Sequence, residues 1–223
     1  MKTQNDPFAY GLLAGLLVFL LGLVVNAGCI HSSKLDGRDV QARADEAVEI
    51  TARCQDTSGQ GWVFYGSGVI VDAHTILTAG HVATAEPGMF CGWTAEMSNG
   101  KEYSVMPSIV LPGVDLASMV SMLAFDPTYP IVFGPIPKLG ERVCSSTAHP
   151  MRLIRCGEAQ TRVEPPGDLM HTMLVEPGNS GSGVYDTQGR LIGIVTHLMR
   201  CTNGQYCGGK LATLDGHVRE LML

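Results

Sequence analysis

The chain has 223 residues, of which 45% are apolar and 16% charged, and its formal net charge is −6. This length suffices for one medium-sized domain or for two small barrels that share a core. Proteins that bind nucleic acid usually carry a basic face, because contacts to phosphates supply much of their affinity. The acidic balance and the lack of a Lys/Arg cluster in the sequence therefore argue against a nucleic-acid partner.

An uncharged apolar segment runs from Phe8 to Ile30 and reads FAYGLLAGLLVFLLGLVVNAGCI. About 20 apolar residues can cross the hydrocarbon core of a bilayer as a helix. We therefore expect residues 1–30 to form a hydrophobic signal or anchor segment, and 31–45 a polar linker. The globular domain is expected at residues 46–223, held at a membrane on its extracytoplasmic side, either in the periplasm or at the cell surface.

Two mechanisms of anchoring remain open. The small residues before Cys29 resemble the lipobox of bacterial lipoproteins, in which the cysteine is lipidated and becomes the new N-terminus. Asn26 departs from the leucine usual in that motif. The alternative is an uncleaved transmembrane helix, since residues 8–30 are long enough to span a bilayer. Either mechanism would leave residues 31–223 outside the cytoplasm at a membrane surface.

Six cysteines follow the apolar segment, an even number that is typical of disulfide bonds formed in an oxidising compartment. We expect three disulfides, with Cys201 near Cys207, and the remaining pairing stays open. A zinc site is one competing interpretation, but this pair is too widely spaced and lacks a matching histidine pattern. Six free thiols are the other alternative. No metal or other cofactor is therefore expected. The six cysteines are Cys54, Cys91, Cys144, Cys156, Cys201 and Cys207.

Short strands separated by turns dominate the domain, which indicates an all-β barrel or sandwich. Asn99-Gly100 predicts a hairpin, and His149-Pro150 and Asp186–Gly189 predict turns. The last ten residues have a helical pattern. The predicted strands are 48–54, 62–71 interrupted at Gly66–Gly68, 75–78, the two hairpin segments 94–97 and 101–105, 143–145, 153–156, 184–185 and 191–196.

Three short motifs carry the chemistry. They are Thr78-Ala79-Gly80-His81, Asp115-Leu116-Ala117 and the glycine-rich run Gly178-Asn179-Ser180-Gly181-Ser182-Gly183. Each motif alone is weak evidence for catalysis, since a histidine at a strand end or an aspartate in a turn usually has a structural role. Together they supply a serine nucleophile, a histidine base and an aspartate that orients the histidine.

The order and content of these motifs resemble the trypsin/chymotrypsin-like serine protease family, and most closely its bacterial Deg-type and glutamyl-endopeptidase-type members. Gly66–Ile70 and Gly193–Val195 also match. The resemblance covers about residues 46–223. It implies two six-stranded antiparallel barrels with the active site in the cleft between them, followed by a short C-terminal helix. His81 and Asp115 would come from the first barrel and Ser180 from the second.

The resemblance also implies a role for each motif residue. Ser180 would be the nucleophile, His81 the general base and then acid, and Asp115 the residue that orients His81. The backbone amides of Gly178 and Ser180 would form the oxyanion hole. Ser182 is the rival nucleophile in the same loop.

Two departures from the family pattern affect activation and specificity. Asn179 stands where animal digestive members have an aspartate that pairs with a new N-terminus, so that activation switch is expected to be missing. Leu174 would lie near the floor of the primary pocket, with Thr196, His197 and Leu198 along one wall. Leu198 replaces a common glycine, which favours small or medium apolar residues before the cleaved bond. His197 leaves acidic residues there as the alternative.

The sequence therefore predicts a membrane-tethered serine endopeptidase that acts on protein or peptide substrates. The alternative is a catalytically silent homologue that serves as a membrane-tethered binding module. A third hypothesis, that the protein is a membrane-anchored structural protein, leaves the order of the three motifs unexplained.

Overall fold

A computed structural model of the whole chain describes residues 43–126, 131–163, 168–200, 202 and 206–222. The chain divides into two compact units, residues 1–34 and 35–223, and every described residue belongs to the second. The predicted apolar segment at 8–30, and Cys29 within it, lie outside the described residues. Within the described ranges, no helix has the length and apolar character needed to cross a membrane.

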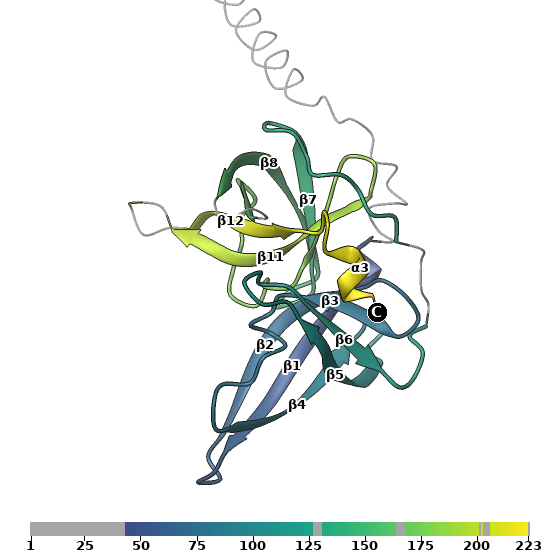
Figure 1. Cartoon of the computed structure of the whole chain (residues 1–223), viewed down its shortest axis with the longest axis vertical. Coiled ribbons are helices and arrows are strands. Elements are labelled where there is room, and N and C mark those ends of the chain that lie inside the picture. Colours follow the sequence, from purple (N-terminus) through teal and green to yellow (C-terminus); the bar gives the residue numbers. More distant parts are fainter. Residues whose placement is uncertain (1–42, 127–130, 164–167, 201, 203–205, 223) are drawn as a thin grey trace, which may run out of the picture. The chain divides into compact units, whose positions relative to one another are not determined.

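The described residues form two closed, six-stranded antiparallel barrels, as the family resemblance implied (Figure 1). In the first barrel the strands follow the order β1-β2-β3-β6-β5-β4, and in the second β7-β8-β9-β12-β11-β10, so both barrels share one topology. The first barrel consists of β1 (Ala47–Asp56), β2 (Gly61–Ile70), β3 (Thr75–Thr78), β4 (Met89–Glu96), β5 (Glu102–Val110) and β6 (Ala117–Ser121). The second consists of β7 (Arg142–Thr147), β8 (Leu153–Val163), β9 (Asp168–His171), β10 (Gly183–Tyr185), β11 (Leu191–Arg200) and β12 (Tyr206–Thr213).

Alternating apolar residues close each barrel. Val48, Ile50, Ala52 and Cys54 on β1 are all buried, which is the period-2 pattern of a strand with one face toward a core. Each barrel has its own cluster of buried side chains. A third cluster joins the two barrels; it includes Val69, Leu77, Leu116, Leu191, Ile194 and Leu221.

Two predicted elements differ from the structure. Strand β2 runs without a break through Gly66–Gly68, because the glycines make room inside the barrel: a Cβ on Gly68 would lie 2.5 Å from Ile76 Cγ2. The C-terminal helix, predicted over the last ten residues, is only α3 (Val218–Leu221). Gly216 has φ of +81°, which a right-handed helix cannot contain.

Three strands, β6, β9 and β12, have no counterpart among the predicted ones. Glycines within β12, at Gly208 and Gly209, weaken its strand pattern. They are tolerated because other backbone lies close to them: a Cβ on Gly209 would lie 2.8 Å from the carbonyl oxygen of His197.

Disulfides link neighbouring strands in both barrels. Cys54 and Cys91 face each other across β1 and β4, and Cys144 and Cys156 across β7 and β8. Cys207 is also disulfide-bonded. Cys201, expected near it, lies outside the described residues, so that pairing stays a prediction. Disulfides of this kind are typical of domains that fold outside the cytoplasm.

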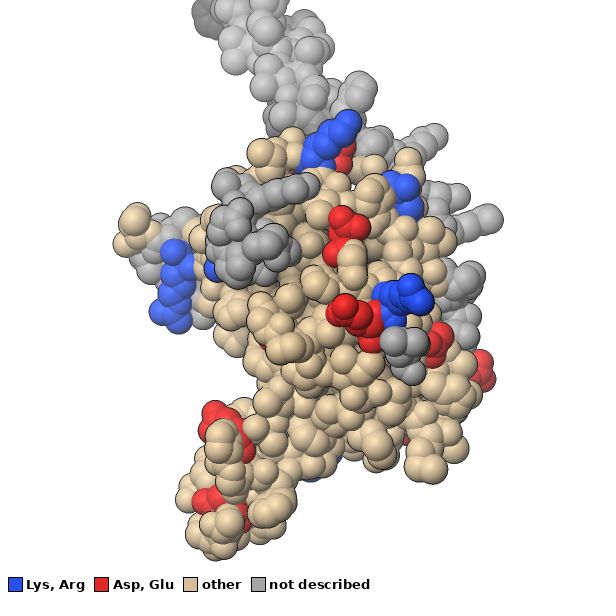
Figure 2. All heavy atoms as spheres, viewed as in Figure 1, with Lys and Arg blue, Asp and Glu red and all other residues tan. Residues whose placement is uncertain are grey.

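Charged side chains are sparse on the surface. On the face shown in Figure 2, lysines and arginines lie in separate small groups, and acidic residues are scattered between them. This distribution offers no continuous basic patch on that face.

Candidate active site

Neighbouring strands bring His81 and Asp115 together. His81 follows β3 by three residues and Asp115 precedes β6 by two, and Thr78 pairs with Ala117 at these ends of the two strands. The Nδ1 atom of His81 lies 2.8 Å from Oδ2 of Asp115, and the backbone N–H of His81 donates to Oδ1 at 2.8 Å. The carboxylate therefore holds both the ring and the backbone of His81.

The environment of Asp115 determines the tautomer of His81. Burial opposes ionisation of Asp115, but the hydrogen bond from His81 and the charge of His81 outweigh it, so the pKa of Asp115 lies below its ordinary value. An ionised carboxylate only accepts hydrogen bonds, so Nδ1 of His81 must carry the proton. In a neutral ring this leaves Nε2 as the proton acceptor, which is the state that a general base requires.

Ser180 reaches the same pocket from the second barrel. The pocket has a volume of about 500 Å³ and is lined by His81, Asp115, Ser180, Thr196, His197 and Leu198. The Ser180 hydroxyl donates to the carbonyl oxygen of Thr196 at 3.2 Å, not to His81. In enzymes without substrate, catalytic hydrogen bonds are often long or misaligned and tighten only in the complex. The three residues expected to act together therefore share one pocket.

The backbone around Ser180 leaves two amides available. Gly178 and Gly181 have φ of +92° and +93°, a region that glycine occupies at low cost. The amides of Asn179, Gly181 and Ser182 donate to backbone carbonyls. Among the described residues, the amides of Gly178 and Ser180 have no acceptor. These are the two amides predicted for the oxyanion hole.

Asn179 and Ser67 hold this loop in place. Asn179 is 1% exposed; its Oδ1 accepts from the amide of Glu176 at 2.9 Å and its Nδ2 donates to the carbonyl of His149 at 2.6 Å. The Ser67 hydroxyl donates to the carbonyl of Gly178 at 2.9 Å, and the Ser67 amide donates to the carbonyl of Ser180 at 2.7 Å. Both polar ends of Asn179 are thus satisfied without any charged partner.

The sequence predicted only a turn at His149-Pro150, and the position of His149 against the Ser180 loop could not be predicted. Its Nδ1 lies 3.1 Å from Oε2 of Glu49 on β1, and its ring stacks on Tyr65 of β2 with centroids 4.7 Å apart. On its other side the ring lies directly against Gly178, where an added Cβ would overlap Cδ2 of His149. The histidine therefore fills the space between the first barrel and the loop that carries Ser180.

The expected specificity residues separate into two groups. Thr196, His197 and Leu198 line the pocket that contains Ser180, and Nδ1 of His197 lies 3.8 Å from Oδ2 of Asp115. Leu174 does not line that pocket; its side chain is 48% exposed and its carbonyl accepts from Arg155. Its role at the floor of the primary pocket stays a prediction.

The remaining histidines offer no metal site in the described part of the chain, where no group of three or more His, Cys, Asp or Glu side chains could hold an ion. His171 is 2% exposed and both of its ring nitrogens lack a hydrogen-bond partner there. Burial lowers the pKa of His171 to about 4, so its ring is neutral at physiological pH.

Comparison with known proteins identifies the fold and the family. The structure titled "HtrA-type protease AlgW with decapeptide" is similar to this chain, with a TM-score of 0.67 and 18% sequence identity. The match covers 83% of this chain and 66% of that one. The structure titled "HtrA-type protease AlgW with tripeptide" has a TM-score of 0.64 and 20% sequence identity. That match covers 83% of this chain and 60% of the other. The chain thus spans less than two thirds of these structures, and at these identities the similarity shows the fold alone. No curated protein matches the sequence. Residues 66–194, more than half of the chain, match the family model described as trypsin-like peptidase domain, and the chain therefore belongs to the trypsin-like peptidase family.

Proposed function

We propose that the protein is a serine endopeptidase in which Ser180, His81 and Asp115 hydrolyse peptide bonds. The observation that carries this proposal is the 2.8 Å contact between His81 and Asp115 in the pocket that also contains Ser180. The two barrels supply these residues separately, and the shared buried cluster holds the barrels together. Such an arrangement fits a reaction that needs the nucleophile and base in a fixed relation.

In the proposed reaction, Nε2 of His81 takes the proton of the Ser180 hydroxyl as Oγ bonds to the scissile carbonyl carbon. The amides of Gly178 and Ser180 donate to the oxyanion of the tetrahedral intermediate. The C–N bond then breaks, and His81 gives its proton to the leaving amine. Water repeats these steps on the acyl-enzyme and releases the acid.

The proposed substrates are proteins or peptides. The two AlgW structures are named for a bound decapeptide and tripeptide, which supports peptide binding by this fold. Leu198 in the pocket favours a small or medium apolar residue before the scissile bond. The alternative is a catalytically silent homologue that binds a partner while tethered to a membrane, and the hydroxyl of Ser180, which donates to Thr196, is compatible with it.

Covalent labelling with a fluorophosphonate tests the proposal. The full-length chain should be labelled, Ser180→Ala should not, and Ser182→Ala should retain labelling. Ser182 is the matched control because it lies two residues further in the same loop and its side chain is fully buried. Peptide hydrolysis should fall by roughly four to six orders of magnitude in Ser180→Ala. Absence of labelling in the unmodified chain would favour the binding module, and undiminished hydrolysis by Ser180→Ala would exclude Ser180 as the nucleophile.

We further propose that residues 1–30 anchor the domain to a membrane with its active site outside the cytoplasm. The disulfides within both barrels support an oxidising location. Intact-mass measurement distinguishes the two mechanisms: cleavage before Cys29 with added acyl mass indicates a lipoprotein, and a retained Met1 indicates a transmembrane helix. A soluble product without acyl groups that starts after residue 28 would contradict both.

A further inference from the structure

The direction of the Gly178 amide depends on a bond about which glycine rotates readily. Gly178 has φ of +92°, and glycine adopts positive and negative φ at similar cost. A flip of the peptide between Pro177 and Gly178 would turn this N–H away from the oxyanion. The proposed donor therefore needs a constraint from outside the glycine itself.

The buried hydroxyl of Ser67 provides one such constraint. It donates to the Gly178 carbonyl at 2.9 Å and accepts from the amide of Ala148 at 3.3 Å. This bond fixes the peptide that follows Gly178, whereas the oxyanion donor belongs to the peptide that precedes it. A second contact is required to hold that preceding peptide.

The ring of His149 lies where this second contact is required. It packs so closely against Gly178 that an added Cβ would overlap Cδ2 of the ring. Close packing on the Cα atom leaves little space for the backbone rearrangement that a peptide flip involves. The ring can therefore restrain Gly178 without a hydrogen bond to it.

Two side chains of the first barrel fix the ring of His149. Glu49 of β1 pairs with Ser67 of β2, and Tyr65 lies two residues before Ser67, so the three share one face of these strands. The ring stacks on Tyr65 with an angle of 4° between the planes. Its buried Nδ1 lies 3.1 Å from Oε2 of Glu49, close but without the alignment of a hydrogen bond. The first barrel thus sets both the plane and the rotation of the ring.

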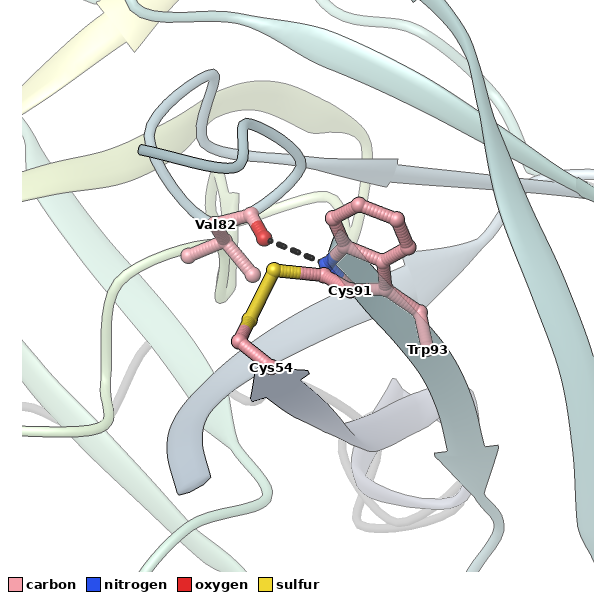
Figure 3. Close-up of a disulfide and its surroundings, with 4 residues drawn as sticks. All are labelled: Cys54, Val82, Cys91 and Trp93. Atoms are coloured by element: carbon pink, nitrogen blue, oxygen red, sulfur yellow. Dashed lines mark hydrogen bonds between the residues drawn. A yellow bond between two sulfur atoms is a disulfide. The ribbon is translucent and has the colours of Figure 1, made fainter. Parts of the chain in front are cut away.

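The strands behind the ring are cross-linked. The Cys54–Cys91 disulfide joins β1 to β4, and the indole Nε1 of Trp93 on β4 donates to the carbonyl of Val82 at 3.1 Å (Figure 3). The ring of His149 therefore packs between Gly178 and a reinforced part of the first barrel.

The turn that carries His149 is fixed to the same strands. The guanidinium group of Arg152 donates to the carbonyls of Ala47 on β1 and Glu96 on β4. His149 consequently cannot move away from the first barrel without breaking these bonds.

We propose that His149 is a positioning residue, which keeps the Gly178 amide directed at the oxyanion by packing between the first barrel and the Ser180 loop. This inference rests on the proposed function. Two pockets include Ser180 and His149 lines neither, so it acts through Gly178 and not on the substrate. Because the oxyanion forms only as the reaction proceeds, loss of the ring lowers kcat and leaves KM nearly unchanged.

Substitutions of His149 in the full-length chain test the inference. His149→Ala removes the ring but keeps the backbone carbonyl that accepts from Asn179. The kcat per active serine, counted by titration with a fluorophosphonate, should fall about 10–100-fold, and KM should change less than about threefold. The expected loss is smaller than that of a deleted oxyanion donor, about 10²–10³-fold, because the amide is displaced and not removed. Counting active serines separates this effect from a loss of folded protein.

Two comparisons accompany this variant. His149→Phe keeps an aromatic ring against Tyr65 and Gly178, and its kcat should lie between those of His149→Ala and the unmodified chain. His74→Ala is the matched control, because His74 is exposed and lines neither pocket, and it should keep the kcat of the unmodified chain.

Glu49→Ala approaches the same ring from its other side. It should lower kcat in the unmodified chain but not in His149→Ala, because Glu49 acts through His149. If His149→Ala fails to fold, Glu49→Ala and His149→Phe decide the outcome by their kcat per active serine. An unchanged kcat in His149→Ala, a loss confined to KM, or a kcat of His149→Phe no higher than that of His149→Ala would overturn the inference. Where only Glu49→Ala and His149→Phe fold, an unchanged kcat in both would do so. Absence of both labelling and hydrolysis in the unmodified chain would overturn the proposed function instead.

Discussion

Replacement of Gly181 by alanine tests how tightly the Ser180 loop is packed against the first barrel. Gly181 has φ of +93°, and an added Cβ would overlap the carbonyl oxygen of Ser67 and the hydroxyl of Thr78. The positive φ costs about 1–2 kcal/mol for a residue with a Cβ. The overlap also breaks two hydrogen bonds of 2.7 Å, each of which contributes about 1 kcal/mol. One joins the Thr78 hydroxyl to the Ser67 carbonyl, and the other joins the Ser67 amide to the Ser180 carbonyl. We expect a total destabilisation of about 3–4 kcal/mol.

Gly88→Ala separates these two contributions. Gly88 has a similar φ of +84°, but nothing lies within 4 Å of an added Cβ. The Gly88→Ala substitution should therefore lower the free energy of unfolding only by the conformational part, about 1–2 kcal/mol. The effect of alanine on the unfolded chain cancels between the two variants. Urea unfolding of both variants gives the difference. A difference below about 1 kcal/mol would refute the claim that the close approach of Ser67 requires glycine at position 181.

Three further predictions concern the site and the fold. Asp115→Asn should lower kcat by about 10⁴-fold, because an amide favours the wrong tautomer of the histidine, and steady-state kinetics on a peptide substrate measures this. His171 has its pKa lowered by burial, so the folded state binds fewer protons than the unfolded state between pH 6.5 and about 4. Between pH 6.5 and 5, the free energy of unfolding of the unmodified chain should therefore fall by about 2 kcal/mol more than that of His171→Leu. Replacing Cys54 and Cys91 by serine should cost about 4 kcal/mol in urea unfolding, about 1 kcal/mol more than removing the β7–β8 disulfide, because 37 residues separate the first pair and 12 the second.

Each of these expectations has a contrary outcome. Asp115→Asn with undiminished kcat would mean that His81 does not depend on its carboxylate partner. Parallel stability–pH curves for the unmodified chain and His171→Leu would mean that the buried ring is not held neutral. Equal losses from the two disulfides would show that loop length does not govern their contributions.

Strand patterns and turns in the sequence predicted most of the individual strands, whereas their arrangement in two barrels was implied by the family resemblance. Asn99-Gly100 forms the turn between β4 and β5, with Gly100 at φ of +79°, because local backbone chemistry alone favours that turn. Strand β12, whose pattern is interrupted by Gly208 and Gly209, escaped prediction. Its pairing depends on strands that are distant in the sequence, and local residue preferences do not report such pairing.

The sequence by itself determined which chemical groups are present and in what order, and this order led to His81, Asp115 and Ser180 as candidates. Only the tertiary structure decided which of them meet: the pairing of β3 with β6 puts His81 within 2.8 Å of Asp115, 34 residues away. The packing of His149 against Gly178 also arises only in the folded chain. It brings together two segments from distant parts of the sequence, and nothing in the local pattern of either segment specifies its partner.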